Sequence, residues 1–169
     1  ALHPDFSSLA WNGGKGYGIP INKVNLSTPT YHVTFDYDDE SDVAAPGRPP
    51  GYPIPSEAKT QQRWIEGGLA GGDANADGDR HMLIVDRDLR ILYELYALHW
   101  TGSRWEGGSG AIFPLDSNAR RPDGWTSADA AGLAIFPGLV RFDEAQRGIN
   151  HALRVTVRAT NGYVWLGWR

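Results

Sequence analysis

Three titratable residues, His81, Glu94 and His151, occupy apolar positions of runs that alternate like β-strands. Side chains alternate between the two faces of a strand. The alternation therefore predicts that all three residues face the packed side of a sheet. A titratable group on that side must be hydrogen-bonded, neutralised or used, since an unpaired buried polar group costs a few kcal/mol. The pattern predicts one functional cleft shared by the three residues, with three separate structural residues as the alternative.

Acid–base chemistry on a sugar is one use of such a cleft. Glu94 with Asp129 or Glu144 would supply the acid and the base that cleave a glycosidic bond. His151 with Arg154 would instead abstract a proton from a uronate and neutralise its charge, although the alternation points Arg154 away from His151. Trp125 lies near Asp129 in the same turn-rich loop, and its flat ring is suited to stacking on a sugar. In the alternative interpretation, Asp129 only favours the start of a short helix.

A run of alternating oxygen ligands lies just before His81. Gly78 falls at the sixth position of this run, as in the first half of a calcium loop. The bidentate Glu expected at position twelve is missing, and acidic, Gly-rich segments are also good turns. The sequence therefore gives calcium as a conditional prediction, and the proposed ligands are Asp73, Asn75, Asp77 and Asp79.

Composition sets the class of protein. The chain has 169 residues with 41% apolar residues and seven Trp, enough for the core of a single domain spanning 1–169. A net charge of −4 without a basic cluster argues against nucleic acid, and no apolar run is long enough to span a bilayer. The absence of cysteine excludes disulfides and thiolate chemistry. Many Gly, Pro and aromatic residues favour a secreted, polysaccharide-handling protein whose signal peptide has been removed, and nothing suggests an organic cofactor.

The expected elements are mostly short strands separated by Gly, Pro, Asn and Asp. This rhythm predicts an all-β fold, an antiparallel sandwich, jelly roll or small barrel, with one or two short helices. The helices are expected at Ser56–Ile65, capped by Ser56, and at Ser127–Leu133. The strands are expected at 19–24, 31–37, 81–85, 91–98, 110–115, 139–142, 152–157 and 163–165.

Several motifs resemble those of a family of secreted bacterial proteins with no established activity. They are LHPDF at 2–6, GDRH at 78–81, LYELY at 92–96, GWTSADAAGL at 124–133, PGLVRFDE at 137–144 and INHALR at 149–154. The resemblance spans nearly the whole chain and implies export. Family members continue beyond the segment that matches 163–165, so the chain is expected to be a short relative or a fragment. The resemblance adds His3 to His81 and His151 as histidines in matching positions.

A transition-metal site is the competing chemistry. Neutral imidazoles of His3, His81 and His151 would bind Zn or Cu, and Asp79 or Glu94 would orient the rings. No pair of these histidines has the short spacing of a metal motif, so their convergence depends on the fold.

The sequence-based hypothesis is a secreted carbohydrate-active protein that acts on a polysaccharide through a His/carboxylate cleft, as a glycoside hydrolase or a polysaccharide lyase. The alternatives are a non-catalytic extracellular sugar-binding module, a subunit of a surface assembly and a His-ligated metal protein. The expected partner is an extracellular glycan, and the sequence indicates no oligomeric state.

Overall fold

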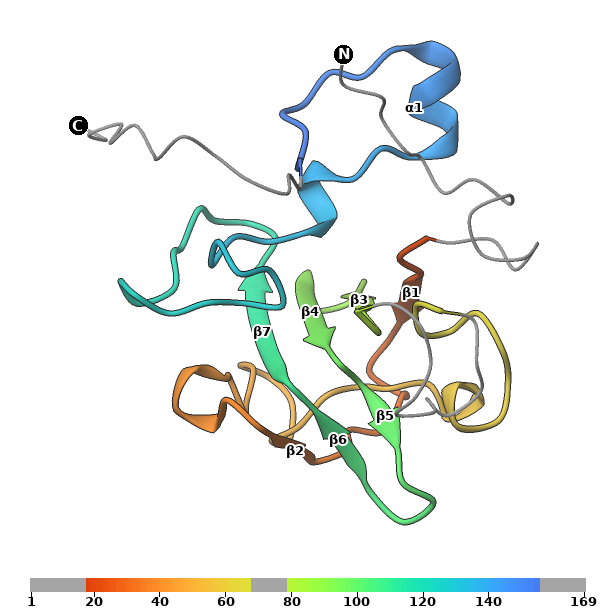
Figure 1. Cartoon of the computed structure of the whole chain (residues 1–169), viewed down its shortest axis with the longest axis vertical. Coiled ribbons are helices and arrows are strands. Elements are labelled where there is room, and N and C mark those ends of the chain that lie inside the picture. The colour runs from red at the N-terminus through yellow and green to blue at the C-terminus, as the bar shows by residue number, and fades with distance from the viewer. Residues whose placement is uncertain (1–17, 68–78, 156–169) are drawn as a thin grey trace. The chain divides into compact units, whose positions relative to one another are not determined.

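The computed structural model describes residues 18–67 and 79–155. The chain divides into two compact units, Ala1–Phe136 and Pro137–Arg169 (Figure 1). Within the described residues, no helix is both long enough and apolar enough to cross a bilayer.

Short strands dominate the first unit. Its strands are β1 (Ile21–Val24), β2 (Val33–Phe35), β3 (Met82–Asp86), β4 (Ile91–Tyr96), β5 (His99–Trp100), β6 (Trp105–Gly107) and β7 (Ser109–Pro114). Two 3-10 helices, η1 (Asp38–Glu40) and η2 (Ser56–Lys59), lie in its loops, and η3 (Phe136–Gly138) crosses the unit boundary. The second unit contains α1 (Phe142–Arg147).

The strands form two mixed sheets. The larger has the order β1-β3-β4-β7, and the smaller has the order β2-β6-β5. In the larger sheet β3, β4 and β7 are antiparallel, with Leu83 opposite Glu94 and Glu94 opposite Ala111. The strands β1 and β2 join β3 and β6 in parallel, so the prediction of an antiparallel fold holds for only part of each sheet.

One long hairpin links the two sheets. Its first arm runs from β4 into β5 and its second from β6 into β7, and Figure 1 shows both arms passing from one sheet to the other. At the bend Ala97 has a positive φ of 51°, and the Gly108 nitrogen donates to the Tyr96 carbonyl at 2.8 Å. A Cβ on Gly108 would lie 2.6 Å from the Tyr96 ring, so this corner requires glycine.

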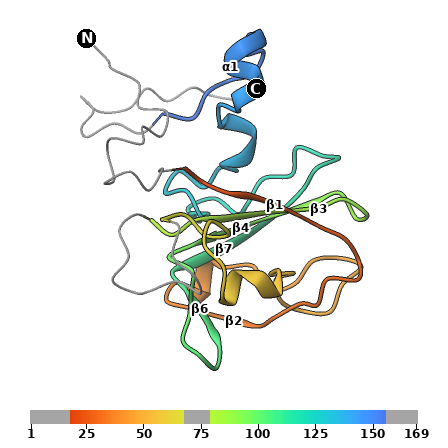
Figure 2. The same ribbon diagram turned by 90° about the vertical axis from the view of Figure 1, so that its right-hand side faces the viewer.

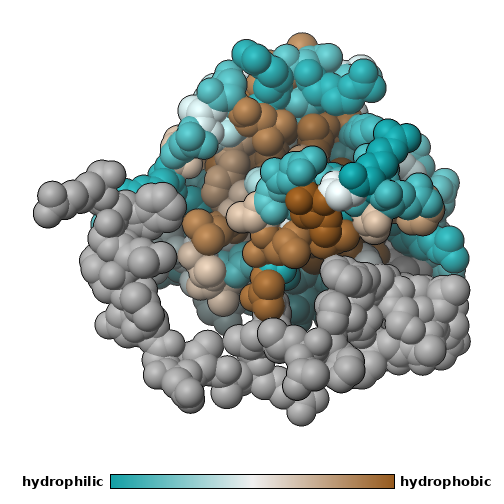
Figure 3. Space-filling view, turned by 90° about the horizontal axis from the view of Figure 1, so that it is seen from above, coloured by the Kyte–Doolittle hydropathy of each residue, from teal (hydrophilic) through white to brown (hydrophobic). Residues whose placement is uncertain are grey.

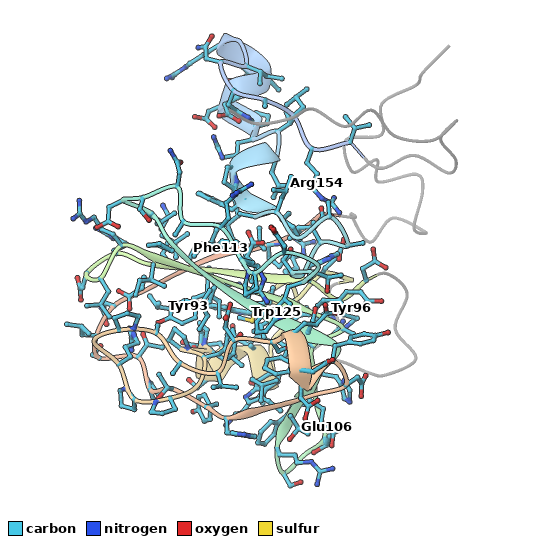
Figure 4. The ribbon with its side chains drawn as sticks, turned by 90° about the vertical axis from the view of Figure 1, so that its left-hand side faces the viewer. Tyr93, Tyr96, Glu106, Phe113, Trp125 and Arg154 are labelled. Carbon is cyan, nitrogen blue, oxygen red and sulfur yellow. The ribbon has the colours of Figure 1, made fainter. Side chains whose placement is uncertain are left out.

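The main core occupies one face of the larger sheet. Met82, Ile84, Tyr93 and Leu95 are fully buried there, together with Trp105 of the smaller sheet. Figure 2 shows the larger sheet edge-on, with β2 and β6 on this side and the teal segment that follows β7 on the other. The opposite face is also closed, because Leu83, Leu92 and Ala111 are fully buried. Figure 4 shows Tyr93 and Phe113 on opposite sides of the sheet.

The prediction of a mainly β fold is confirmed, and a sandwich or jelly roll stays a prediction. Several local predictions were wrong. The expected helix Ser56–Ile65 stops after η2, and Pro55 stands at its N-cap position in place of Ser56. The segment expected to be a helix at Ser127–Leu133 forms turns, because Ser127 and Asp129 bind nearby backbone groups.

The second unit also departs from the sequence prediction. A strand was expected at 139–142, but the chain there is irregular and leads into α1. Glu144 accepts a hydrogen bond from the Arg141 nitrogen at 3.0 Å, which satisfies a donor at the start of the helix. Gly148, with a φ of 105°, ends it. No strand occurs in the described part of the expected strand 152–157.

Large apolar side chains are exposed in the described part of the second unit. Phe142 is 81% exposed, and Ile149, Leu153 and Val155 are exposed as well. Figure 3 looks onto the chain from above and shows apolar residues, in brown, gathered among hydrophilic ones, in teal. Residues 137–155 therefore bury little apolar surface of their own, in contrast to the closed core of the first unit.

Candidate functional site

The candidate site is the face of the larger sheet that lies opposite the main core. Three polar side chains lie on this face. The strand register places Glu94 of β4 and Ser109 of β7 there, and His81 precedes β3 and is two residues from Leu83. All three are buried, and each contacts the backbone of the loop 127–136. We call this loop the cover, because its backbone lies over these side chains.

Glu94 binds the C-terminal end of the cover. Its side chain is 0% exposed, and its carboxylate accepts hydrogen bonds from the backbone nitrogens of Ile135, at 2.8 and 2.9 Å, and Phe136, at 2.8 Å. Burial raises the pKa of Glu94 to about 7, although these two N–H groups and the charge of His81 oppose the rise. The charge of Asp129 raises it further. Glu94 thus titrates near neutral pH without facing solvent.

His81 contacts the N-terminal end of the cover. Its Nε2 lies 3.0 Å from the carbonyl oxygen of Ala128, and its Nδ1 lies 2.7 Å from Oε2 of Glu66. The same Glu66 oxygen accepts the backbone N–H of His81 at 3.1 Å. A carbonyl and a carboxylate only accept, so this pair of partners favours a ring in which both nitrogens carry a hydrogen, the imidazolium form. Burial lowers the pKa of His81, but the Glu66 hydrogen bond and charge outweigh it and raise the pKa overall.

These contacts limit what the cluster can do chemically. Both ring nitrogens of His81 are engaged, by Glu66 and by the Ala128 carbonyl, and in the imidazolium form neither has a lone pair for a metal ion or for proton abstraction. The Glu94 carboxylate is fully buried and already accepts three bonds from the cover. In this state, His81 and Glu94 fix the cover to the sheet, and a substrate would reach them only if the cover moved.

Asp129 and Trp125 lie in or next to the cover. Asp129 is close enough to Glu94 for its charge to act on that carboxyl, and its Oδ1 accepts the Ala131 nitrogen at 2.9 Å. The Trp125 ring is half-buried, and the guanidinium carbon of Arg121 stands 5.2 Å from its centroid. The structure therefore brings His81, Glu94 and Asp129 into one electrostatic neighbourhood, with Trp125 nearby in the sequence.

Arg121 is itself fixed by several contacts. Its Nε donates to the Thr126 carbonyl at 2.8 Å, and its terminal nitrogens reach the Asp42 carboxylate and the Glu40 carbonyl. The Thr126 nitrogen and hydroxyl donate to the Glu40 carboxylate, at 2.9 and 2.7 Å, and lower the pKa of Glu40. These contacts hold the Trp125 ring on a polar, charged surface.

His151, Glu144 and Arg154 lie in the second unit. The Nε2 of His151 is 3.2 Å from Oε1 of Glu144, and its Nδ1 is 2.8 Å from the Ala152 carbonyl. These acceptors raise the pKa of His151, with the Ala152 carbonyl as the largest cause. Arg154 donates its backbone N–H to the Gly138 carbonyl at 2.9 Å. The shared cleft of His81, Glu94 and His151, and the pairing of His151 with Arg154, stay predictions.

The metal predictions fall largely outside the described residues. His3, Asp73, Asn75 and Asp77 lie there, whereas Asp79 is described and exposed, and its charge raises the pKa of His81. Among residues 18–67 and 79–155, no three His, Asp or Glu side chains form a group that could hold a metal ion.

Sequence reasoning missed two parts of this cluster. Glu66 follows the expected helix Ser56–Ile65, so no alternation pointed it inward. Ser109 donates to the Ser127 carbonyl at 2.8 Å, but a serine among glycines is typical of a loop. The signal that was present is the alternation around Ala111, which extends inward to Ser109 once β7 begins there.

No protein-family model matches the chain. Comparisons with curated proteins and with solved structures found no match either. Any proposal about function must therefore come from the geometry of the site.

Proposed function

We propose that this chain is a secreted, non-catalytic module that binds an extracellular glycan on the surface around Trp125. The observation that carries the proposal is the bonding of Glu94 and His81, whose polar atoms are already engaged by the cover and by Glu66. Acid–base catalysis needs a group within hydrogen-bond reach of the substrate. In this structure these two residues stabilise a loop.

The surface around Trp125 has the composition of a sugar site. Sugars offer an apolar ring face and many hydroxyl groups, so their sites combine an aromatic ring with fixed polar groups. Trp125 supplies a half-buried ring, and the nearby carboxylates of Glu40 and Asp42 are partly exposed. Arg121 joins these groups by its contacts with Asp42 and with the Trp125 ring. The groups are held before a ligand arrives, which lowers the entropic cost of binding.

A glycoside hydrolase or polysaccharide lyase is the second candidate. It is favoured by one observation, the pKa of Glu94 of about 7, since a general acid works best with a pKa near the operating pH. This candidate requires the cover to open and expose Glu94.

Binding and turnover measurements with two variants separate these functions. The wild type, Trp125→Ala and Glu94→Gln would be tested against a panel of soluble polysaccharides by affinity electrophoresis and by reducing-sugar release. A binding module loses affinity in Trp125→Ala by about tenfold or more, equal to about 1.4 kcal/mol, retains it in folded Glu94→Gln and shows no turnover. Turnover that disappears in Glu94→Gln while binding persists would establish the enzyme instead. A folded wild type that neither binds nor cleaves any polymer would reject both and favour a surface-assembly subunit.

A further inference from the structure

Lys59 lies between two aromatic rings on the side of the larger sheet that is opposite the cover. Its ammonium nitrogen lies 4.2 Å from the centroid of the Tyr31 ring and 4.3 Å from that of the Trp100 ring. Figure 2 shows the short η2 helix that ends at Lys59, in yellow, on the side of the sheet that β2 and β6 occupy. All three side chains are half-buried.

Each of the three residues is positioned by a different piece of backbone. Tyr31 exchanges two backbone hydrogen bonds of 2.9 Å with Tyr52, and Trp100 pairs with Trp105 between β5 and β6. Lys59 ends η2, which is anchored by the fully buried Ala58. Tyr31 and Trp100 also pack against the main core. The fold therefore fixes the two rings and the backbone of Lys59, and the rings hold the ammonium at the end of its stem.

No carboxylate pairs with this ammonium in the described part of the chain. The Lys59 ammonium forms no ion pair and no side-chain hydrogen bond within residues 18–67 and 79–155, and it lies over the faces of the two rings. A ring face attracts a cation but accepts its hydrogens only weakly, so these two ring contacts leave the three N–H donors able to bind an oxygen ligand. This contrasts with Arg48, whose buried guanidinium is paired with Asp86 at 2.6 Å.

The groups around the Lys59 ammonium favour an anionic ligand. A ring carries negative charge on its faces and positive charge at its edges, so a group that approaches the ammonium past the rims of Tyr31 and Trp100 is favoured when it is negative. An ammonium binds an oxyanion as a point charge through its N–H donors, and the carboxylate of a uronate is such an oxyanion on a glycan. The rings also offer apolar area to the body of a ligand that carries this carboxylate.

We propose that Tyr31, Lys59 and Trp100 form a subsite that binds the carboxylate of a uronate residue in an acidic glycan. This inference rests on the proposed glycan-binding function and specifies its ligand. The chain's net charge of −4 gives no general attraction for a polyanion, so recognition must come from such a local cation. The subsite lies on the side of the larger sheet that β2 and β6 occupy, so it is a contact separate from the surface around Trp125.

The test compares polygalacturonate with its fully methyl-esterified form, which has the same backbone without the charge. The variant Lys59→Met keeps an apolar stem against the rings, and Lys59→Arg keeps the charge. We expect Lys59→Met to weaken binding to polygalacturonate about tenfold or more, equal to about 1.4 kcal/mol, and to leave binding of the ester unchanged. Lys59→Arg should stay within about threefold of the wild type. Equal loss for both polymers in Lys59→Met, or no loss for either, would overturn the proposal.

A second measurement keeps this result separate from the failure of the proposed function. Carbon-13 and proton shifts of the Lys59 Cε group would be followed while galacturonate or its methyl ester is added to the wild-type chain. We expect the acid alone to shift this signal, even if the chain retains no polymer and the glycan-binding function fails. Loss of both polymers in Trp125→Ala with the Lys59 shift intact would confirm two distinct contacts. A Lys59 signal that ignores galacturonate would reject the subsite.

Discussion

The carboxylate of Glu94 lies 2.8 Å from the backbone nitrogen of Ile135, a residue 41 positions further along the chain. This bond links the middle of β4 to the end of the cover. The cover has no strand or α-helix over residues 127–135, so its backbone donors must be satisfied in another way. Glu94 supplies the acceptor that a neighbouring strand would otherwise provide.

Replacing Glu94 by Gln should destabilise the protein by about 1–3 kcal/mol. The amide would bring two donors toward the N–H groups of Ile135 and Phe136, where the carboxylate offers only acceptors. Urea unfolding measures the change. The matched control is Glu57→Gln on the exposed side of η2, for which we expect less than about 0.5 kcal/mol. Equal effects in both variants would show that Glu94 does not hold the cover.

Stability should fall as the pH rises from 4.5 through 7. Glu94 has a pKa of about 7 in the folded chain against an ordinary value of 4.5, so the folded state binds its proton more tightly. Its contribution is fully present below pH 4.5 and is lost as the pH passes 7, and it amounts to about 3 kcal/mol.

Other groups with shifted pKa values affect stability in different pH ranges, according to the direction of the shift. The raised pKa of His81 gives a contribution that is present below pH 6.5 and is lost above its folded pKa. Glu40, Glu106 and Glu144 have lowered pKa values, so their contributions are lost only as the pH falls below 4.5. Unfolding free energies measured across this range should therefore slope downward in the wild type and less steeply in Glu94→Gln. A parallel slope in the variant would contradict the assignment.

The pair of His81 and Glu66 should show strong coupling. The pair is buried, so removing one of its two charges costs about 3–5 kcal/mol, whereas the double replacement removes both charges together. The double variant His81→Leu with Glu66→Leu should therefore cost less than the sum of the two single variants. Additive effects would contradict the ion pair. Nitrogen-15 shifts of the ring provide an independent check, because an imidazolium has both nitrogens protonated.

Calcium should raise the melting temperature if the residues Asp73, Asn75, Asp77 and Asp79 form the predicted loop site. A ligand that binds only the folded chain stabilises it by about 2.7 kcal/mol at a hundred times its dissociation constant. Calorimetry with added calcium and with a chelator measures this change. The control is Asp77→Asn with Asp79→Asn, which should abolish the difference, and equal melting temperatures in the wild type would remove the calcium prediction.

Alternation groups His81 with Leu83 and Glu94 with Leu92 because it depends only on neighbouring residues. The main core nevertheless lies on the other face of β3 and β4, with Met82, Ile84, Tyr93 and Leu95. Alternation placed His81 and Glu94 correctly among buried residues. The partners of these residues could not be predicted, because Glu66 and Ile135 come from irregular segments that lack any period. The same limit explains why α1 was not predicted. The apolar run Leu139–Phe142 has the pattern of a strand, and the contact of Glu144 with the Arg141 nitrogen, which starts the helix, gives no periodic signal.

The parallel pairing of β1 with β3 has a consequence for the order of folding. β3, β4 and β7 pair through connections that are close in sequence, whereas Ile21 pairs with Leu83 across a long intervening stretch. Loop closure of that length is slow, so we expect β1 to join the sheet last. Until it does, the outer edge of β3 presents unpaired backbone groups beside apolar side chains. A newly made chain would be most prone to aggregation during that interval, and slow addition of β1 would set its duration.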